Sequence, residues 1–510
     1  MSGITRRDFN AGALSLAALS AAGTGAHAQE SGRPFTVALA EEPDTLDPIL
    51  SNDTPIVWVS LLNIVEPLVG IGTDGNIRPG VATWHASDDG KTIEFKIREG
   101  VIFHSGDPLT ADDLAFSHAR SLAKNPFYKR HAHAVEGFEV VDRQTFRIRF
   151  SAPDAAYLPT RAFLVESKAY HDRVGEEAFV KHPVGTGPYK FAGYAFGEHL
   201  DFAAFDRYWG GAPQIKRARF IFVKDDTTRL AKLRAGEADL ILGTPFPAVK
   251  SLEEAGFHIE RVPVNPSVGL YFDLFNTKMP WGDLRVRQAM AYAIDGEAIV
   301  KGLLQGMPTR YPWLAPGEIG YDPSLKFYPY DPAKAKALLK EAGYANGFTI
   351  PLYYSEGQYY GIRQTVEAVA LYFHAIGIKA EPRGHEVIDL IKLIRKAHTD
   401  PSVPFAAVFA NYVANTASPV DALGLSFWSK SPFAMYDNPA FDRPYEEAKR
   451  TLDDTKRGDL IRQAIKVLDH DKIIYTLWDN VDVYAMSAKV RFKPTHKSLP
   501  MLLIDDMHVS

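Results

Sequence analysis

Four histidines close together in sequence are the first residues that could do chemistry. They are His104, His118, His131 and His133. Neutral imidazole rings are good ligands for zinc and nickel, so a metal site is conceivable here. The alternative is a solvated loop that happens to carry His131 and His133. Because the spacing alone does not define a metal cage, we expect no bound metal.

The motifs of the common catalytic sites are missing from the sequence. There is no G-x-S-x-G nucleophile elbow and no H-E-x-x-H zinc motif. Gly90 opens a Gly-Lys-Thr triplet like the end of a phosphate loop, but His85 stands where that loop needs its first glycine. The chain has no cysteine, which excludes disulfides and thiolate chemistry. We therefore predict no enzyme and no cofactor, and keep an enzyme that uses a cleft as a remote alternative.

Composition and charge narrow the class of partner. The 57 Lys and Arg residues against 62 Asp and Glu give a net charge of −5, which lacks the basic footprint of a nucleic-acid-binding protein. Aromatic residues make up 12% of the chain, including 23 Tyr and 7 Trp. That surplus suits a protein that lines a cleft with rings, although a large aromatic core would give the same composition.

The start of the chain has the pattern of an export signal. Arg6 and Arg7 precede a mildly apolar stretch over residues 11–22, and Ala26-His27-Ala28 gives a small-residue cleavage site. The stretch is shorter than the roughly 20 apolar residues of a membrane span. The arginine pair favours the twin-arginine route, with an ordinary Sec signal as the alternative. We predict a signal peptide over residues 1–28 and a soluble periplasmic protein that is not a lipoprotein.

The elements that would position a site alternate between strands and helices. Residues 91–98 and 143–150 alternate apolar and polar side chains, which predicts two half-buried strands. Thr110 is placed to cap a helix, and Thr227 or Thr228 is expected to open another. Strand-helix-strand units recur in both halves of the chain, which predicts mixed α/β layers in two lobes.

A long pattern identifies the family. Residues 82–120 read ATWHASDDGKTIEFKIREGVIFHSGDPLTADDLAFSHAR. This resembles the signature region of the extracellular solute-binding proteins of family 5, the peptide, nickel and opine receptors of ABC importers. Further segments match the family in order along the chain, at residues 45–48, 184–191, 208–211, 231–240, 275–289 and 331–343. The chain is therefore identified as a member of this family.

The resemblance implies an α/β, two-lobed periplasmic-binding-protein fold that closes as a hinged trap, with an extra subdomain inserted in lobe 1. We expect lobe 1 over residues 29–271 with the insertion at about 61–185, lobe 2 over 272–481, and a return to lobe 1 over 482–510. The resemblance also implies a monomer that binds a small-molecule or peptide solute and meets an inner-membrane ABC permease with its ATPase. Neither a nucleic acid nor a direct membrane anchor is expected.

Two positions depart from the dipeptide receptors of the family. Those receptors hold the ligand's ammonium with an Asp, and the matching position, counted back from Pro419, is Asn415. They also place an Arg near the ligand's carboxylate, and here that position falls near Glu356. A neutral amide gives a buried ammonium no compensating charge, which would cost several kcal/mol.

The residues near these loops suggest the ligand class. Tyr, Trp, Asn and Glu side chains suit polyhydroxy compounds or cationic groups over rings. We predict an oligopeptide or peptide-like solute, with a sugar-derived or opine-like conjugate as the alternative. The expected ligand-binding residues are Asn52, Asp53, Thr54, Tyr354, Glu356, Tyr359, Tyr412, Asn415 and Trp428.

Overall fold

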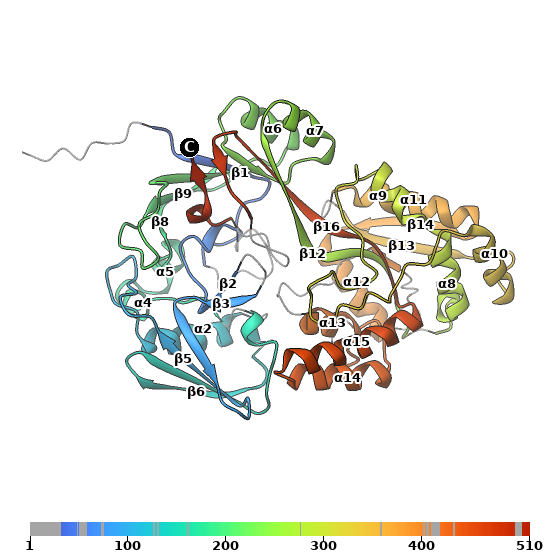
Figure 1. Ribbon diagram of the computed structural model, residues 1–510, viewed down its shortest axis with the longest axis horizontal. Coiled ribbons are helices and arrows are strands. Elements are labelled where there is room, and N and C mark those ends of the chain that lie inside the picture. The colour runs from blue at the N-terminus through green and yellow to red at the C-terminus, as the bar shows by residue number, and fades with distance from the viewer. Residues whose placement is uncertain are drawn as a thin grey trace, which may run out of the picture. The chain divides into compact units, whose positions relative to one another are not determined.

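The computed structural model describes residues 32–47, 49, 59–72, 76–125, 128–129, 132–160, 163–275, 277–356, 360–400, 403, 407–409, 419–431, 434–494 and 502–510. Its largest element is a mixed sheet of ten strands (Figure 1). In spatial order the strands are β14 (Lys379–His385), β13 (Thr349–Ser355), β15 (Ala407–Phe409), β12 (His258–Phe272), β16 (Ile474–Met486), β11 (Leu240–Leu242), β1 (Phe35–Leu39), β10 (Arg217–Phe222), β9 (His199–Ala204) and β8 (Tyr189–Ala195).

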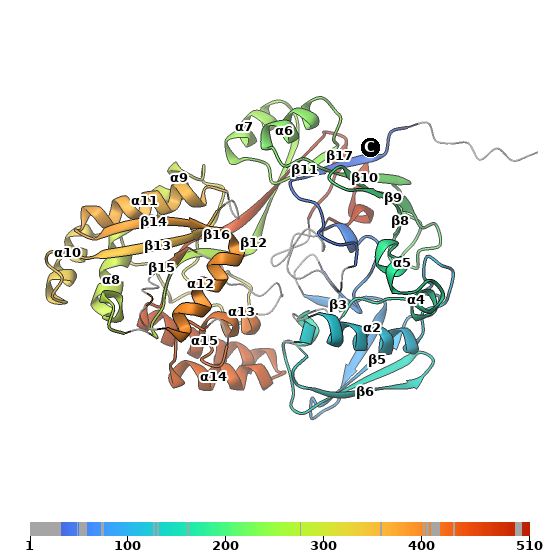
Figure 2. The ribbon, with the colours of Figure 1, turned by 180° about the vertical axis from the view of Figure 1, so that it is seen from behind.

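The sheet holds two sets of parallel strands separated by a pair of long antiparallel strands. In one set β1 runs parallel to β10 and β11, and in the other β13 runs parallel to β14 and β15. Between the sets lie β12 and β16, which are side by side in both views (Figures 1 and 2). Their ladder is irregular between Pro263 and Ser267. On one side of this point β16 also pairs with β11, and on the other β12 also pairs with β15.

The buried side chains divide in the same way. One core cluster gathers residues of β13, α8 (Leu284–Ala293), α11 (Ile362–Ala375) and α15 (Asp454–Asp471). A second gathers residues of β1, β9 and β10. Because each set of parallel strands has its own apolar core, each can pack as a unit and leave the long strands as the connection.

A third core belongs to a separate sheet of four strands. Its order is β4 (Ala82–Ala86), β5 (Thr92–Ile97), β7 (Thr145–Phe150) and β6 (Val135–Asp142). Ile93, Phe95 and Ile97 face this core, as the alternation in residues 91–98 predicts. Two-stranded pairs are formed by β2 (Val69–Ile71) with β3 (Ile77–Pro79) and by β17 (Val490–Arg491) with β18 (His508–Val509).

Helices cover the sheets and begin where capping side chains stand. The remaining helices include α2 (Ala111–Lys124), α4 (Lys168–Val174), α5 (Glu176–Lys181), α6 (Asp226–Arg234), α7 (Phe246–Glu254), α9 (Gly296–Gly302), α10 (Pro332–Glu341), α12 (Val387–Thr399), α13 (Pro419–Phe427) and α14 (Pro439–Arg450). At the start of α2 the backbone N–H of Thr110 donates to Asp113 over 2.9 Å, which is the capping box that the sequence predicts. The expected start at Thr227 or Thr228 is wrong by one to two residues, because Asp225 caps α6 and accepts from the N–H of Thr228.

None of the helices in the described residues is both long and apolar enough to cross a membrane. The α/β class predicted from the sequence is confirmed by the two sets of parallel strands and their covering helices.

Candidate functional site

The candidate site lies where the carboxyl ends of the two parallel sets come together. Ligands of open α/β sheets bind outside the carboxyl ends of the strands. After β11 the chain turns into α7 at Phe246, and after β13 it leads to Tyr360, which precedes α11. The rings of Phe246 and Tyr360 have centroids 4.5 Å apart. This contact brings the segments that follow the two sets of strands next to each other.

Tyr354 and Glu356, two of the predicted ligand residues, meet at the end of β13. The Tyr354 hydroxyl donates to Glu356 Oε1 over 2.8 Å, and Arg363 Nη2 of α11 donates to Oε2 over 3.0 Å. Burial raises the pKa of Tyr354, and its bond to Glu356 adds to the rise. Arg363 therefore balances the charge of Glu356, and the correspondence of Glu356 with the Arg of dipeptide receptors stays a prediction.

Trp428 occupies a different neighbourhood. Its Nε1 donates to Glu446 Oε1 over 3.0 Å, and the Lys449 ammonium lies 4.9 Å from the centroid of its ring. Both partners belong to α14. In the described part of the chain no contact joins Trp428 to Tyr354 or Glu356. Its role in ligand binding stays a prediction.

The other six predicted ligand residues lie outside the described residues. They are Asn52, Asp53, Thr54, Tyr359, Tyr412 and Asn415. Tyr412 and Asn415 belong to the segment between β15 and α13, which follows the carboxyl end of a parallel strand.

Two acidic residues of β16, Asp479 and Asp482, are not among the ligand-binding residues predicted from the sequence. Burial raises the pKa of Asp479 to about 7 and that of Asp482 to about 7. Asp479 accepts a hydrogen bond from the Ser267 hydroxyl, across the irregularity of the β12–β16 ladder. The signal in the sequence is a pair of carboxyl groups inside the otherwise apolar run of residues 473–486.

The histidines considered as metal ligands have other partners. His104 Nε2 lies 2.8 Å from the carbonyl oxygen of Gly187, and His118 Nδ1 lies 2.7 Å from the Tyr128 hydroxyl. Burial lowers the pKa of both rings to about 4, so they are neutral at pH 7. His131 lies outside the described residues. Within the described residues no group of three or more His, Asp or Glu side chains could hold a metal ion.

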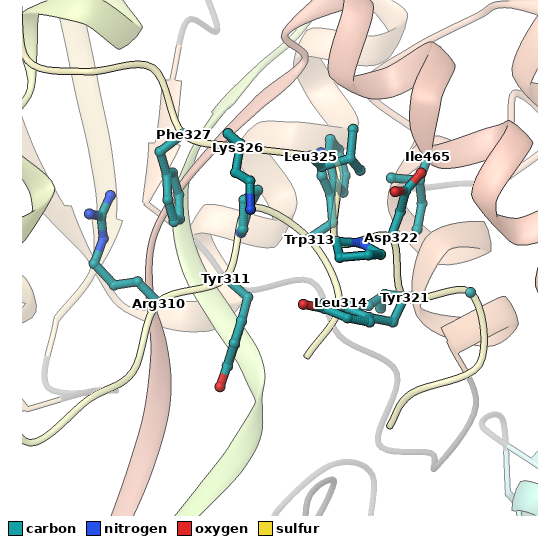
Figure 3. Close-up of a pocket in the computed structure, with 13 residues that line it drawn as sticks. Arg310, Tyr311, Trp313, Leu314, Tyr321, Asp322, Leu325, Lys326, Phe327 and Ile465 are labelled. Atoms are coloured by element: carbon teal, nitrogen blue, oxygen red, sulfur yellow. The ribbon is translucent and has the colours of Figure 1, made fainter. Parts of the chain in front are cut away.

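A pocket of about 210 Å³ lies against one side of α15. Figure 3 shows Trp313, Tyr321 and Asp322 toward one end of it and Lys326 and Phe327 toward the other. Trp313 Nε1 donates to Asp469 over 3.1 Å, and Asp322 accepts from Lys466 over 3.3 Å. The pocket is smaller than the 300–1,000 Å³ typical of ligand sites, and these polar groups already have partners within the chain.

The fold and the paired strand ends define a two-lobed binding protein, and comparison with known proteins agrees. The profile of the bacterial extracellular solute-binding proteins, family 5, middle region, matches residues 76–455. Heme-binding protein A of Haemophilus influenzae is 30% identical over 483 residues, covering 87% of this chain and 86% of the relative. The dipeptide-binding protein of Escherichia coli is 29% identical over 482 residues, covering 86% and 85%.

A solved structure extends the likeness to the fold. The periplasmic binding protein DppA of Helicobacter pylori, in complex with the peptide STSA, has a TM-score of 0.78 at 25% identity, covering 94% of this chain and 98% of that one. The chain therefore belongs to the bacterial extracellular solute-binding proteins of family 5. This confirms the predicted family and the two-lobed fold, and it makes the chain a binding protein by family and not an enzyme.

Proposed function

We propose that this chain is the solute-binding component of an ABC importer and captures an oligopeptide or peptide-like solute between its two lobes. The observation that carries the proposal is the ring contact of Phe246 with Tyr360, which joins the segment after β11 to the segment after β13. Within the described residues of the ten-stranded sheet, the long strands β12 and β16 connect those sets. A solute held at both sets would favour the arrangement in which they approach each other.

The nature of the solute is inferred from relatives and from local chemistry. A relative is named for dipeptides, and a solved neighbour holds a four-residue peptide. The Glu356–Arg363 pair offers both an acceptor and a donor, which suits a peptide that is bound through its backbone and termini. This supports a solute with both kinds of polar group.

The lobe boundaries near Tyr271 and Val481 are part of this proposal. The irregularity of the ladder, between Pro263 and Ser267 on β12 and between Asp479 and Val481 on β16, is the place where the backbone could bend. An export signal over residues 1–28, a periplasmic location and delivery to a permease with its ATPase complete the proposal. N-terminal sequencing of the exported protein, with Gln29 expected as its first residue, checks the signal.

Native mass spectrometry of gently purified protein tests the function. We expect a defined mass released on denaturation, and a melting temperature that rises when a peptide of that mass is added back. A released molecule that the protein has altered chemically would contradict simple capture. A released sugar or opine conjugate would replace the peptide with the alternative solute.

A further inference from the structure

Asp482 is an acidic side chain without a partner on one of the two connecting strands. It is partly buried, in a strand whose other residues are almost all buried. Within the described residues its carboxylate makes no hydrogen bond and no ion pair. Buried carboxylates are normally paired or hydrogen-bonded, so an unpaired one needs an explanation.

The regular alternation of β16 shows which face of the sheet Asp482 occupies. Ala485 packs with Ile241 and with Leu233 and Leu252 of helices α6 and α7. Neighbouring residues of a strand point to opposite faces, so Asp482 and Tyr484 share the face away from those helices. Tyr484 accordingly packs in the core cluster that includes Val37 and Val59.

Two hydroxyl groups beside Asp482 also lack partners. Tyr484 is fully buried and its hydroxyl makes no hydrogen bond among the described residues, and the same holds for the buried hydroxyl of Thr244. Thr244 lies next to Asp482 in space, because its N–H donates to the carbonyl oxygen of Val483 over 2.9 Å. Three polar side chains that lack partners in the described part of the chain therefore lie at adjacent positions, which is the arrangement expected of a site for a polar ligand.

The charge of that group follows from the surroundings. Among the described residues of the β12–β16 ladder, His258, Glu260 and Tyr484 are the titratable side chains on the face of Asp482. His258 is exposed at the start of β12 and contacts Arg491, while burial is the cause of the raised pKa of Asp482. A cationic nitrogen would satisfy the carboxylate, and its N–H groups could also donate to the two hydroxyl oxygens.

We infer that Asp482, with the hydroxyls of Thr244 and Tyr484, binds an ammonium or guanidinium group of the captured solute. This inference rests on the proposed capture of a solute and names the chemical class that the site selects. It places the recognition of positive charge on the connecting strand β16. The solute would then be held at the connection itself, where its binding can bias the angle between the two sets of strands.

Isothermal titration calorimetry with two matched peptides tests the inference. The probes are Lys-Ala-Ala and norleucine-Ala-Ala, both N-acetylated, so that they differ only in the side-chain ammonium. Wild-type protein should bind the lysine peptide at least about tenfold more tightly than the norleucine peptide. Asp482→Asn should remove this preference, so that the two peptides bind with equal affinity. Asp88→Asn, which changes an exposed aspartate in the turn before β5, is the matched control and should keep the preference.

The pH dependence gives a second readout. Since the carboxylate must be ionised to bind a cation, affinity of the wild type for the lysine peptide should rise from pH 5.5 to pH 8, by up to about tenfold per pH unit below the pKa of about 7. The Asp482→Asn variant should show no such rise. An unchanged preference or an unchanged pH profile in this variant overturns the inference and leaves the proposed function standing. If the wild type releases no solute and binds neither peptide, the proposed function fails, and this inference fails with it.

Discussion

Arg120 shows how single residues of the family pattern hold distant segments together. Its guanidinium contacts Asp47 and donates to Glu166 over 2.8 Å and to Glu176 over 3.0 Å. Arg120 ends the signature region, and Asp47 belongs to the matching segment at residues 45–48. The two matching motifs therefore meet in one buried ion cluster, which explains why such residues identify a scaffold without touching a ligand.

Removal of this guanidinium should destabilise the protein strongly. Arg120→Met leaves the buried Asp47 and Glu166 without their cation, and breaking a buried pair from one side costs about 3–5 kcal/mol. Arg207→Met, at an exposed arginine, should stay within about 0.5 kcal/mol of the wild type. Urea unfolding followed by circular dichroism measures both. Equal midpoints for the two variants would show that the cluster contributes nothing to stability.

The buried carboxyl groups make stability depend on pH. Burial raises the pKa of Glu66 to about 7, alongside Asp479 and Asp482 at about 7. In the unfolded chain these groups have pKa values near 4, so between about pH 4 and pH 8 the folded state binds more protons. The free energy of unfolding of the ligand-free protein should therefore fall as pH rises from 5 to 8.

Differential scanning calorimetry of ligand-free protein across this range measures the effect. Glu66→Gln should flatten the pH profile, since it removes one of the titrating groups. A melting temperature that rises steadily from pH 5 to pH 8 would contradict the assignment.

Site residues could be predicted only where a motif or a loop position marked them. Tyr354 and Glu356 were predicted by counting back from the family's segment at Gly377, and the structure brings their side chains together at the end of β13. Arg363 was not expected to balance Glu356, because the turn from β13 into α11 decides which side chains meet. Asp482 could not be predicted as a site residue, because an acidic residue within an apolar run indicates only a buried strand until the residues packed around it are known.

Close packing against a neighbouring stretch of backbone explains the glycines of the segment over residues 184–191. A Cβ on Gly185 would collide with the Ile64 carbonyl oxygen and lie 2.7 Å from Val65 Cα. The N–H of Gly187 donates to the same carbonyl oxygen of Ile64 over 3.0 Å. The segment packs directly on the backbone of residues 63–65, so only glycine fits, and this contact joins the segment before β8 to residues 63–65.

Gly185→Ala should therefore be severely destabilising, by about 3 kcal/mol or more, since backbone atoms cannot move aside as side chains can. Gly302→Ala is the matched control, because nothing lies within 4 Å of a Cβ there and the residue is the last of α9. It should be neutral or stabilising by up to about 1 kcal/mol. Thermal unfolding compares the two. A Gly185→Ala protein as stable as Gly302→Ala would show that the close approach is not rigid.

Helices and strands that depend on residues close together in sequence could be predicted, but the pairing of distant strands could not. The strand of β5 and the cap of α2 depend on residues a few positions apart, so the sequence carries them. The start of α6 was missed because Asp225 and both threonines are good capping residues. The ladder of β12 with β16 joins residues more than two hundred positions apart, and nothing in the sequence predicts this pairing.

Across the whole chain, a second contact supplements the connecting strands. The N–H of Ala155, just after β7, donates to the carbonyl oxygen of Lys449 in α14 over 2.9 Å. Lys449 Nζ lies 3.1 Å from His133 Nε2 and donates to it when that ring is neutral. We name the contact of His133 and Ala155 with Lys449 the clasp. It joins the four-stranded sheet to the C-terminal helices, in addition to the connection through β12 and β16.

The clasp should stabilise the solute-bound arrangement without touching the solute. Lys449→Ala removes a side-chain hydrogen bond and the ammonium's contact with Trp428, which together are worth about 1–2 kcal/mol. If the clasp forms only when the lobes are closed, this loss should weaken solute binding about five- to thirtyfold, chiefly through faster release. Lys456→Ala, at an exposed lysine of the neighbouring helix α15, should leave release unchanged. Stopped-flow displacement of the co-purified solute measures the release rate. If Lys449→Ala releases it no faster than Lys456→Ala, the clasp does not contribute to capture, and the connecting strands alone set the closed state.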